Sequence, residues 1–83
     1  MQEEVFHEVS DEFINLANDL SDDWATPLLS AAIMFAAARF NAFNFQTMDG
    51  DEANREEAIR YYTEQYSKML RENMKELAQP EIS

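Results

Sequence analysis

Arg39 is the residue whose neighbours make it a candidate binding group. It lies between Ala36-Ala37-Ala38 and Phe40-Asn41-Ala42-Phe43, and at helical spacing it shares a face with apolar side chains. A guanidinium in such a place must be paired or stacked, because an unpaired buried charge is very costly. One interpretation is an anchor for an anionic ligand or for a partner's carboxylate. The remaining side chains of that pocket would be Phe35, Phe43, Tyr62 and Tyr66. The structural interpretation is an internal salt bridge, with the arginine stacked on a phenylalanine.

The acidic side chains and the single histidine do not form a catalytic or metal-binding pattern. His7 and Glu4 make one Glu-x-x-His unit, whereas a di-iron bundle uses two such units and further carboxylates. Residues 49–52 fail as a calcium loop, since Asn54 falls where glycine belongs and Arg60 where the bidentate glutamate belongs. With no cysteine and one glycine, thiolate catalysis and a phosphate-binding loop are excluded. We therefore expect no enzyme activity, no metal and no cofactor.

The composition limits the class of protein. The formal net charge of −11 argues against nucleic acid and against anionic membrane surfaces as partners, because each requires basic side chains. An apolar fraction of 46% supplies enough core-forming residues to argue against disorder. The chain has no cysteine and begins with an acidic segment rather than a basic signal sequence. We expect a cytoplasmic protein.

Periodicity predicts an all-α fold with helices over about 3–20, 27–46 and 52–78. The first and third helices have one apolar face each, with steps of three and four residues. The second is apolar or small nearly all round, so it must be buried under other protein or in a membrane. Its uninterrupted apolar run is short, because Arg39 follows Ala38, and a membrane span needs roughly 20 predominantly apolar residues. We expect the two acidic flanking helices to cover it.

Short connections predict an up-down-up antiparallel bundle, with residues 1–78 as one domain and 79–83 as a short flexible tail. The predicted third helix, at roughly 40 Å, is longer than the second, at roughly 30 Å. Its apolar stripe would then extend past the second helix and favour a homodimer, unless the extra turns fray or fold back. The candidate interface residues are Met69, Leu70, Met74 and Leu77.

Three segments resemble a family of small proteobacterial proteins catalogued only as a domain of unknown function. The segments are Asp11-Glu12-Phe13-Ile14-Asn15-Leu16-Ala17-Asn18, Ala36-Ala37-Ala38-Arg39-Phe40-Asn41-Ala42 and Glu64-Gln65-Tyr66-Ser67-Lys68-Met69-Leu70-Arg71-Glu72-Asn73. The resemblance covers about residues 6–73. It implies a bacterial, cytoplasmic, helical protein, and it implies no activity and no catalytic residue.

Two functions from different classes follow from these observations. The first is a small acidic, non-catalytic protein–protein interaction module that self-associates or docks on a larger partner. The second is a small-ligand binder with a pocket around Arg39. The absence of any catalytic constellation in the sequence favours the interaction module.

Overall fold

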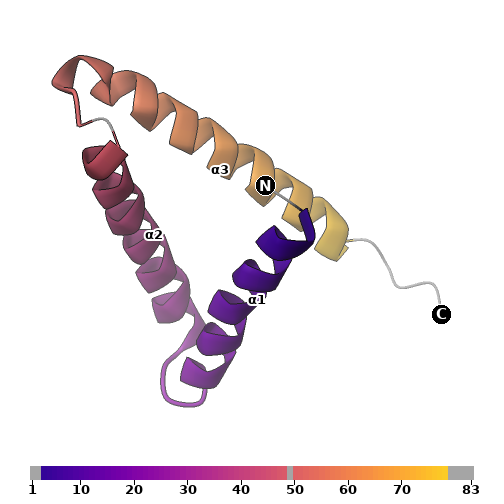
Figure 1. The fold of residues 1–83 in the computed structure, drawn as a ribbon. Helices are drawn as coiled ribbons and strands as arrows, with labels where there is room; N and C mark the ends of the chain where they lie inside the picture. The colour runs from indigo at the N-terminus through magenta and orange to yellow at the C-terminus, as the bar shows by residue number, and fades with distance from the viewer. Residues whose placement is uncertain (1–2, 49, 79–83) are drawn as a thin grey trace. The chain divides into compact units, whose positions relative to one another are not determined.

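Three α-helices and one short 3₁₀ turn make up the described part of the chain. The computed structural model describes residues 3–48 and 50–78. The helices are α1 (Glu3–Leu20), α2 (Thr26–Met48) and α3 (Arg55–Ala78), with the 3₁₀ turn η1 (Glu52–Asn54) before α3 (Figure 1). These ranges contain no strand, so the all-α prediction is confirmed. The up-down-up arrangement stays a prediction, and the predicted tail at 79–83 lies outside the described residues.

The lengths of α2 and α3 correct one prediction. Helix α2 continues through the polar residues Gln46 and Thr47 to Met48, where the hydroxyl of Thr47 donates to the carbonyl of Asn44 at 3.0 Å. Residues 52–54 form the 3₁₀ turn instead of the first turn of α3. The two helices therefore have 23 and 24 residues, and the predicted difference of about 10 Å between them is wrong. Apolar periodicity missed the polar end of α2.

The chain divides into two compact units, Met1–Ala42 (unit 1) and Phe43–Ser83 (unit 2). Unit 1 holds α1 and most of α2. In the turn after α1, the backbone amides of Asp23 and Trp24 each donate to the carbonyl of Leu20 at 3.0 Å, which satisfies a helix end that would otherwise lack partners. Unit 2 holds the last turns of α2, η1 and α3.

Neither unit by itself buries any of the described side chains. Large apolar residues are exposed along all three helices, from 38% at Leu20 to 84% at Leu77. Helix α2 is apolar or small over nearly its whole circumference, yet none of its residues is buried. The cover that this composition demands is therefore not supplied within either unit.

Candidate functional site

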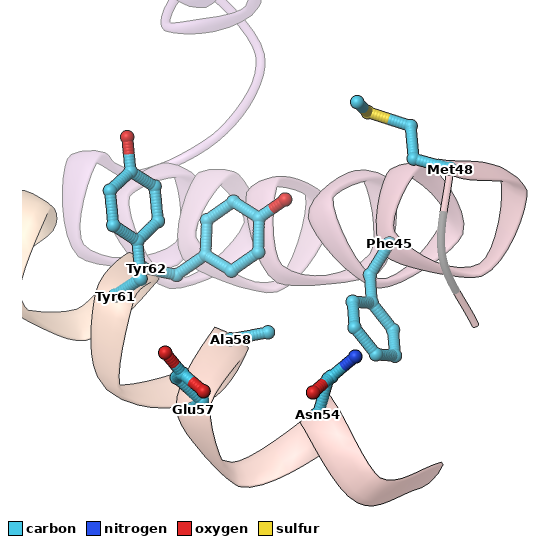
Figure 2. A pocket seen from close by; sticks show the side chains of 7 residues that line it. All are labelled: Phe45, Met48, Asn54, Glu57, Ala58, Tyr61 and Tyr62. Carbon is cyan, nitrogen blue, oxygen red and sulfur yellow. The ribbon is translucent and has the colours of Figure 1, made fainter. Parts of the chain in front are cut away.

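A shallow groove of about 460 Å³ lies within unit 2, where the end of α2 meets the beginning of α3. Figure 2 shows the Phe45 ring pointing from α2 toward Asn54, and the Tyr62 ring extending from α3 toward α2. Most of the lining is aromatic or apolar, with one amide and one carboxylate. The lining residues are Phe45, Met48, Asn54, Glu57, Ala58, Tyr61 and Tyr62.

The walls of the groove include its most buried residues. Phe45, Ala58 and Tyr62 are half-buried, in a chain where most described residues are exposed. The side-chain amide of Asn44 on α2 donates to the hydroxyl of Tyr62 on α3 at 3.4 Å, and a tyrosine hydroxyl that is partly buried usually has such a partner. Tyr61 and Tyr62 pack edge to face, with ring centroids 5.7 Å apart. The aromatic wall is thus held by contacts of its own.

Glu57 is the carboxylate of the groove. Its side chain is exposed, and it forms no hydrogen bond or ion pair with any other described residue. Glu57 and Tyr61 are four residues apart on α3, so they lie on neighbouring turns of the same face. An unpaired carboxylate beside an exposed phenol ring can receive a cation, because the carboxylate supplies charge and the ring supplies a negative π face.

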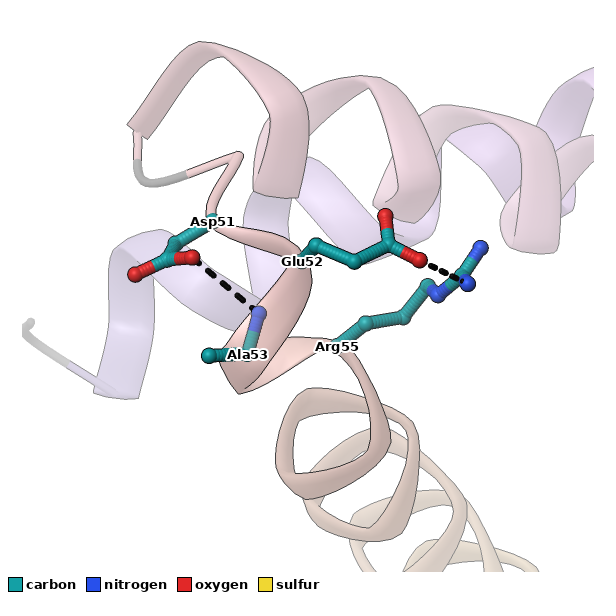
Figure 3. A network of polar contacts seen from close by, with 4 residues as sticks. All are labelled: Asp51, Glu52, Ala53 and Arg55. Atoms are coloured by element: carbon teal, nitrogen blue, oxygen red, sulfur yellow. Dashed lines mark hydrogen bonds and ion pairs between the residues drawn. The ribbon is translucent and has the colours of Figure 1, made fainter.

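The connection between α2 and η1 sets the position of these residues. The backbone amide of Gly50 donates to the carbonyl of Phe45 at 2.9 Å, with Gly50 at a φ of 65°. The carboxylate of Asp51 then caps η1 by accepting from the amide of Ala53 at 3.1 Å, and Arg55 pairs with Glu52 (Figure 3). Asp51 thus caps the 3₁₀ turn that precedes α3, and not α3 itself.

The residues of the predicted Arg39 pocket are divided between the two units. Arg39 and Phe35 belong to unit 1, whereas Phe43, Tyr62 and Tyr66 belong to unit 2. Of these five residues, the groove includes Tyr62 alone. Arg39 is exposed and forms no ion pair with the other described residues. Its salt bridge to an acid on another helix stays a prediction.

The candidate interface residues lie on the exposed apolar stripe of α3. Their exposed fractions are 45% for Met69, 44% for Leu70, 64% for Met74 and 84% for Leu77. Met74 and Leu77, near the end of α3, are more exposed than Met69 and Leu70. Nothing in the structure tests whether these residues contact a partner, so the interface stays a prediction.

Sequence reasoning did not identify the groove itself. The relevant signal was the glycine turn, which brings the last turns of one helix against the first turns of the next. Phe45 lies five residues before Gly50 and Tyr62 twelve residues after it, so the sequence spacing alone does not pair them across the turn. Glu57 and Tyr61 are on the polar side of the predicted helix and gave no signal.

Two further features bear on metal ions and membranes. Within residues 3–48 and 50–78 no group of three or more potential metal ligands comes together, and His7 lies 3.8 Å from Glu3 as an exposed pair. Helix α2 is long and apolar enough to cross a membrane by length and composition alone, with a mean hydropathy of 1.3 in its most apolar window. The core helix of a soluble protein passes the same test.

Comparison with known proteins gives one match. Residues 6–78 fit the model of a family described as protein of unknown function (DUF3144), which confirms the predicted resemblance to a small family without an assigned role. No curated protein and no solved structure matches the chain. The family description assigns no activity and no functional residue. The bacterial origin that the resemblance implied stays a prediction.

Proposed function

Since the chain belongs to DUF3144, a family of unknown function, we propose from its own residues that it is a small, acidic, non-catalytic protein–protein interaction module. The observation that carries this proposal is the apolar surface that neither unit covers. Contiguous apolar surface on a soluble protein marks an interaction site, and its burial is the main favourable term in association. The module self-associates or docks on a larger partner in the cytoplasm.

The three helices form an up-down-up bundle in this proposal. The amphipathic face of α1 and the first half of the apolar stripe of α3 supply the cover that α2 requires, and the second half of that stripe is left for a partner. The predicted overhang of the third helix no longer supports an interface, because α2 and α3 have nearly equal lengths. Support comes instead from the exposure of the second half of α3, which reaches 64% at Met74 and 84% at Leu77.

The distribution of charge makes α3 the favoured contact between two copies. Helix α1 carries acidic residues and no lysine or arginine, so two α1 helices side by side would repel each other. Helix α3 contains equal numbers of acidic and basic residues. The basic residues are Arg55, Arg60, Lys68, Arg71 and Lys75. Two α3 helices can therefore meet without net repulsion between them.

Light scattering over a dilution series tests the proposal directly. We expect a molar mass above the 9.7 kDa of one chain that falls on dilution, as mass action requires. Leu77→Glu places a charge in the proposed interface and should shift the protein to monomer at a concentration where the wild type is associated. Lys68→Gln changes the net charge by the same amount on the opposite face of α3, and it should leave the mass unchanged.

Two results would contradict this assignment of the interface. Equal effects of Leu77→Glu and Lys68→Gln would mean that net charge, and not the apolar stripe, controls association. A wild-type mass of one chain at every concentration would exclude self-association, and docking on a different protein would then be the remaining form of the proposal.

A small-ligand site around Arg39 is the second candidate function. Arg39 forms no ion pair with the other described residues, so its guanidinium is available to an anion. This function predicts that a small anion stabilises the protein, since a ligand that binds only the folded state raises its stability. Arg39→Met would abolish that stabilisation.

A further inference from the structure

We propose that the groove of unit 2 binds an arginine side chain presented by an exposed segment of a basic partner protein. This inference rests on the proposed interaction function and names the chemistry of the partner. The groove provides an aromatic surface and an unpaired carboxylate. The chain to which it belongs is strongly acidic. Each of these three features supports the same occupant.

The aromatic surface suits a planar cation. Tyr61 is 60% exposed, and its edge-to-face contact with Tyr62 leaves the rest of the ring accessible. Tyr62 accepts a hydrogen bond from the Asn44 amide, and Ala58, one turn before Tyr62 on α3, has a side chain too small to fill the groove. A guanidinium stacks on a tyrosine face by cation–π attraction and by planar contact, whereas an ammonium gains only the cation–π part.

The carboxylate of Glu57 supplies the charge that such a cation needs. It has no cationic partner among the described residues, and the nearby Arg55 is paired with Glu52 (Figure 3). In Figure 2 the Glu57 carboxylate lies one turn before Tyr61 on the same helix. An arginine stacked on Tyr61 could therefore direct its N–H groups to the Glu57 oxygens, in the two-bond arrangement that guanidinium and carboxylate favour.

The charge of the whole chain selects a basic partner. The chain has seventeen acidic and six basic residues, which gives a formal net charge of −11. A field of this sign attracts positively charged segments and speeds their encounter. The groove then determines where on the acidic surface one side chain of the partner is held.

An NMR titration with a one-arginine peptide tests the inference. The probe is acetyl-Gly-Gly-Arg-Gly-Gly-amide, and the control peptide carries citrulline, which has a similar shape without the charge. We expect the arginine peptide to shift the amide signals of Phe45, Tyr61 and Tyr62, and the citrulline peptide to leave them unchanged. A lysine peptide should bind more weakly than the arginine peptide, because it lacks the planar group.

Two matched variants separate the groove from general electrostatic attraction. Glu57→Gln and Glu64→Gln each remove one negative charge from α3, and only Glu57 lines the groove. We expect Glu57→Gln to weaken binding about five-fold, as the loss of one exposed ion pair implies, with little change for Glu64→Gln. Equal weakening by the two variants, or signal shifts spread over all acidic segments, would overturn the inference.

The outcome of the peptide titration is independent of the outcome of the light-scattering test of the proposed function. A chain that associates in light scattering but shows no Glu57-dependent binding would retain the interaction function and lose the arginine groove. Glu57-dependent binding by a chain that stays monomeric would retain the groove and exclude self-association. A chain that does neither loses the groove and loses self-association as well.

Discussion

The side-chain amide of Asn44 on α2 donates a hydrogen bond to the hydroxyl of Tyr62 on α3, at 3.4 Å. The two residues are 18 positions apart in the sequence and are half-buried. Because Tyr62 forms part of the groove wall, this bond connects the end of α2 to the geometry of the groove. It is a contact whose removal should change stability and groove shape together.

Removal of the Asn44 amide should destabilise the protein modestly. We expect Asn44→Ala to lower the free energy of unfolding by about 0.5–1.5 kcal/mol, the usual contribution of one hydrogen bond. Urea unfolding at one fixed protein concentration measures it, since association would make stability depend on concentration. Tyr62→Phe removes the same bond from the other side. The double variant should then cost less than the sum of the single variants, and simple additivity would show that the bond contributes nothing.

Replacement of Gly50 should be more damaging than replacement of most exposed residues. Gly50 has a φ of 65°, and a Cβ atom there would lie 2.9 Å from the carbonyl oxygen of Gln46. We expect Gly50→Ala to cost about 1–2 kcal/mol, because a side chain is strained in this left-handed conformation. Gly50→Val should cost more than Gly50→Asn, since asparagine tolerates that backbone region. Equal unfolding midpoints for alanine and glycine would contradict the strain at this turn.

Loss of the Asp51 cap should weaken the beginning of α3. The Asp51 carboxylate accepts from the backbone amide of Ala53 at 3.1 Å (Figure 3). We expect Asp51→Ala to lower the free energy of unfolding by about 1 kcal/mol and Asp51→Asn to have a smaller effect, because asparagine also caps well. Glu52→Gln is the control: it breaks the exposed pair with Arg55, a type of contact that contributes little. If Glu52→Gln were the more damaging change, the ion pair and not the cap would hold this turn.

The helices could be predicted from the sequence because apolar periodicity and helix-end residues act locally. The predicted boundaries of the first helix match those of α1, Glu3 and Leu20. Asp51 caps the 3₁₀ turn η1. The error at residues 52–54 arose because a 3₁₀ turn and an α-helical turn use the same capping residues, and hydrogen bonding, not composition, separates them.

The groove could not be predicted in the same way, because it depends on which faces of two helices meet. Phe45 and Tyr62 were assigned to separate helices, and no local pattern sets their relative rotation. The contact also depends on the connection between the two helices, in which Gly50 has a positive φ that glycine adopts readily. Glu57 could not be singled out either, because an exposed glutamate on a polar helix face has no distinctive sequence pattern. Only its position beside the other lining residues makes it part of the groove.

The role of Arg39 can be decided by its replacement with methionine, which keeps most of the side-chain volume. Arg39 is exposed and unpaired among the described residues, so Arg39→Met should change the free energy of unfolding by no more than about 0.5 kcal/mol, as at other exposed positions. Thermal unfolding with and without sulfate gives the second readout. If sulfate raises the melting temperature of the wild type but not of Arg39→Met, the arginine is an anion site. A loss of about 3 kcal/mol or more without any sulfate effect would instead indicate a buried ion pair in the assembled bundle, because removal of one partner leaves an uncompensated charge.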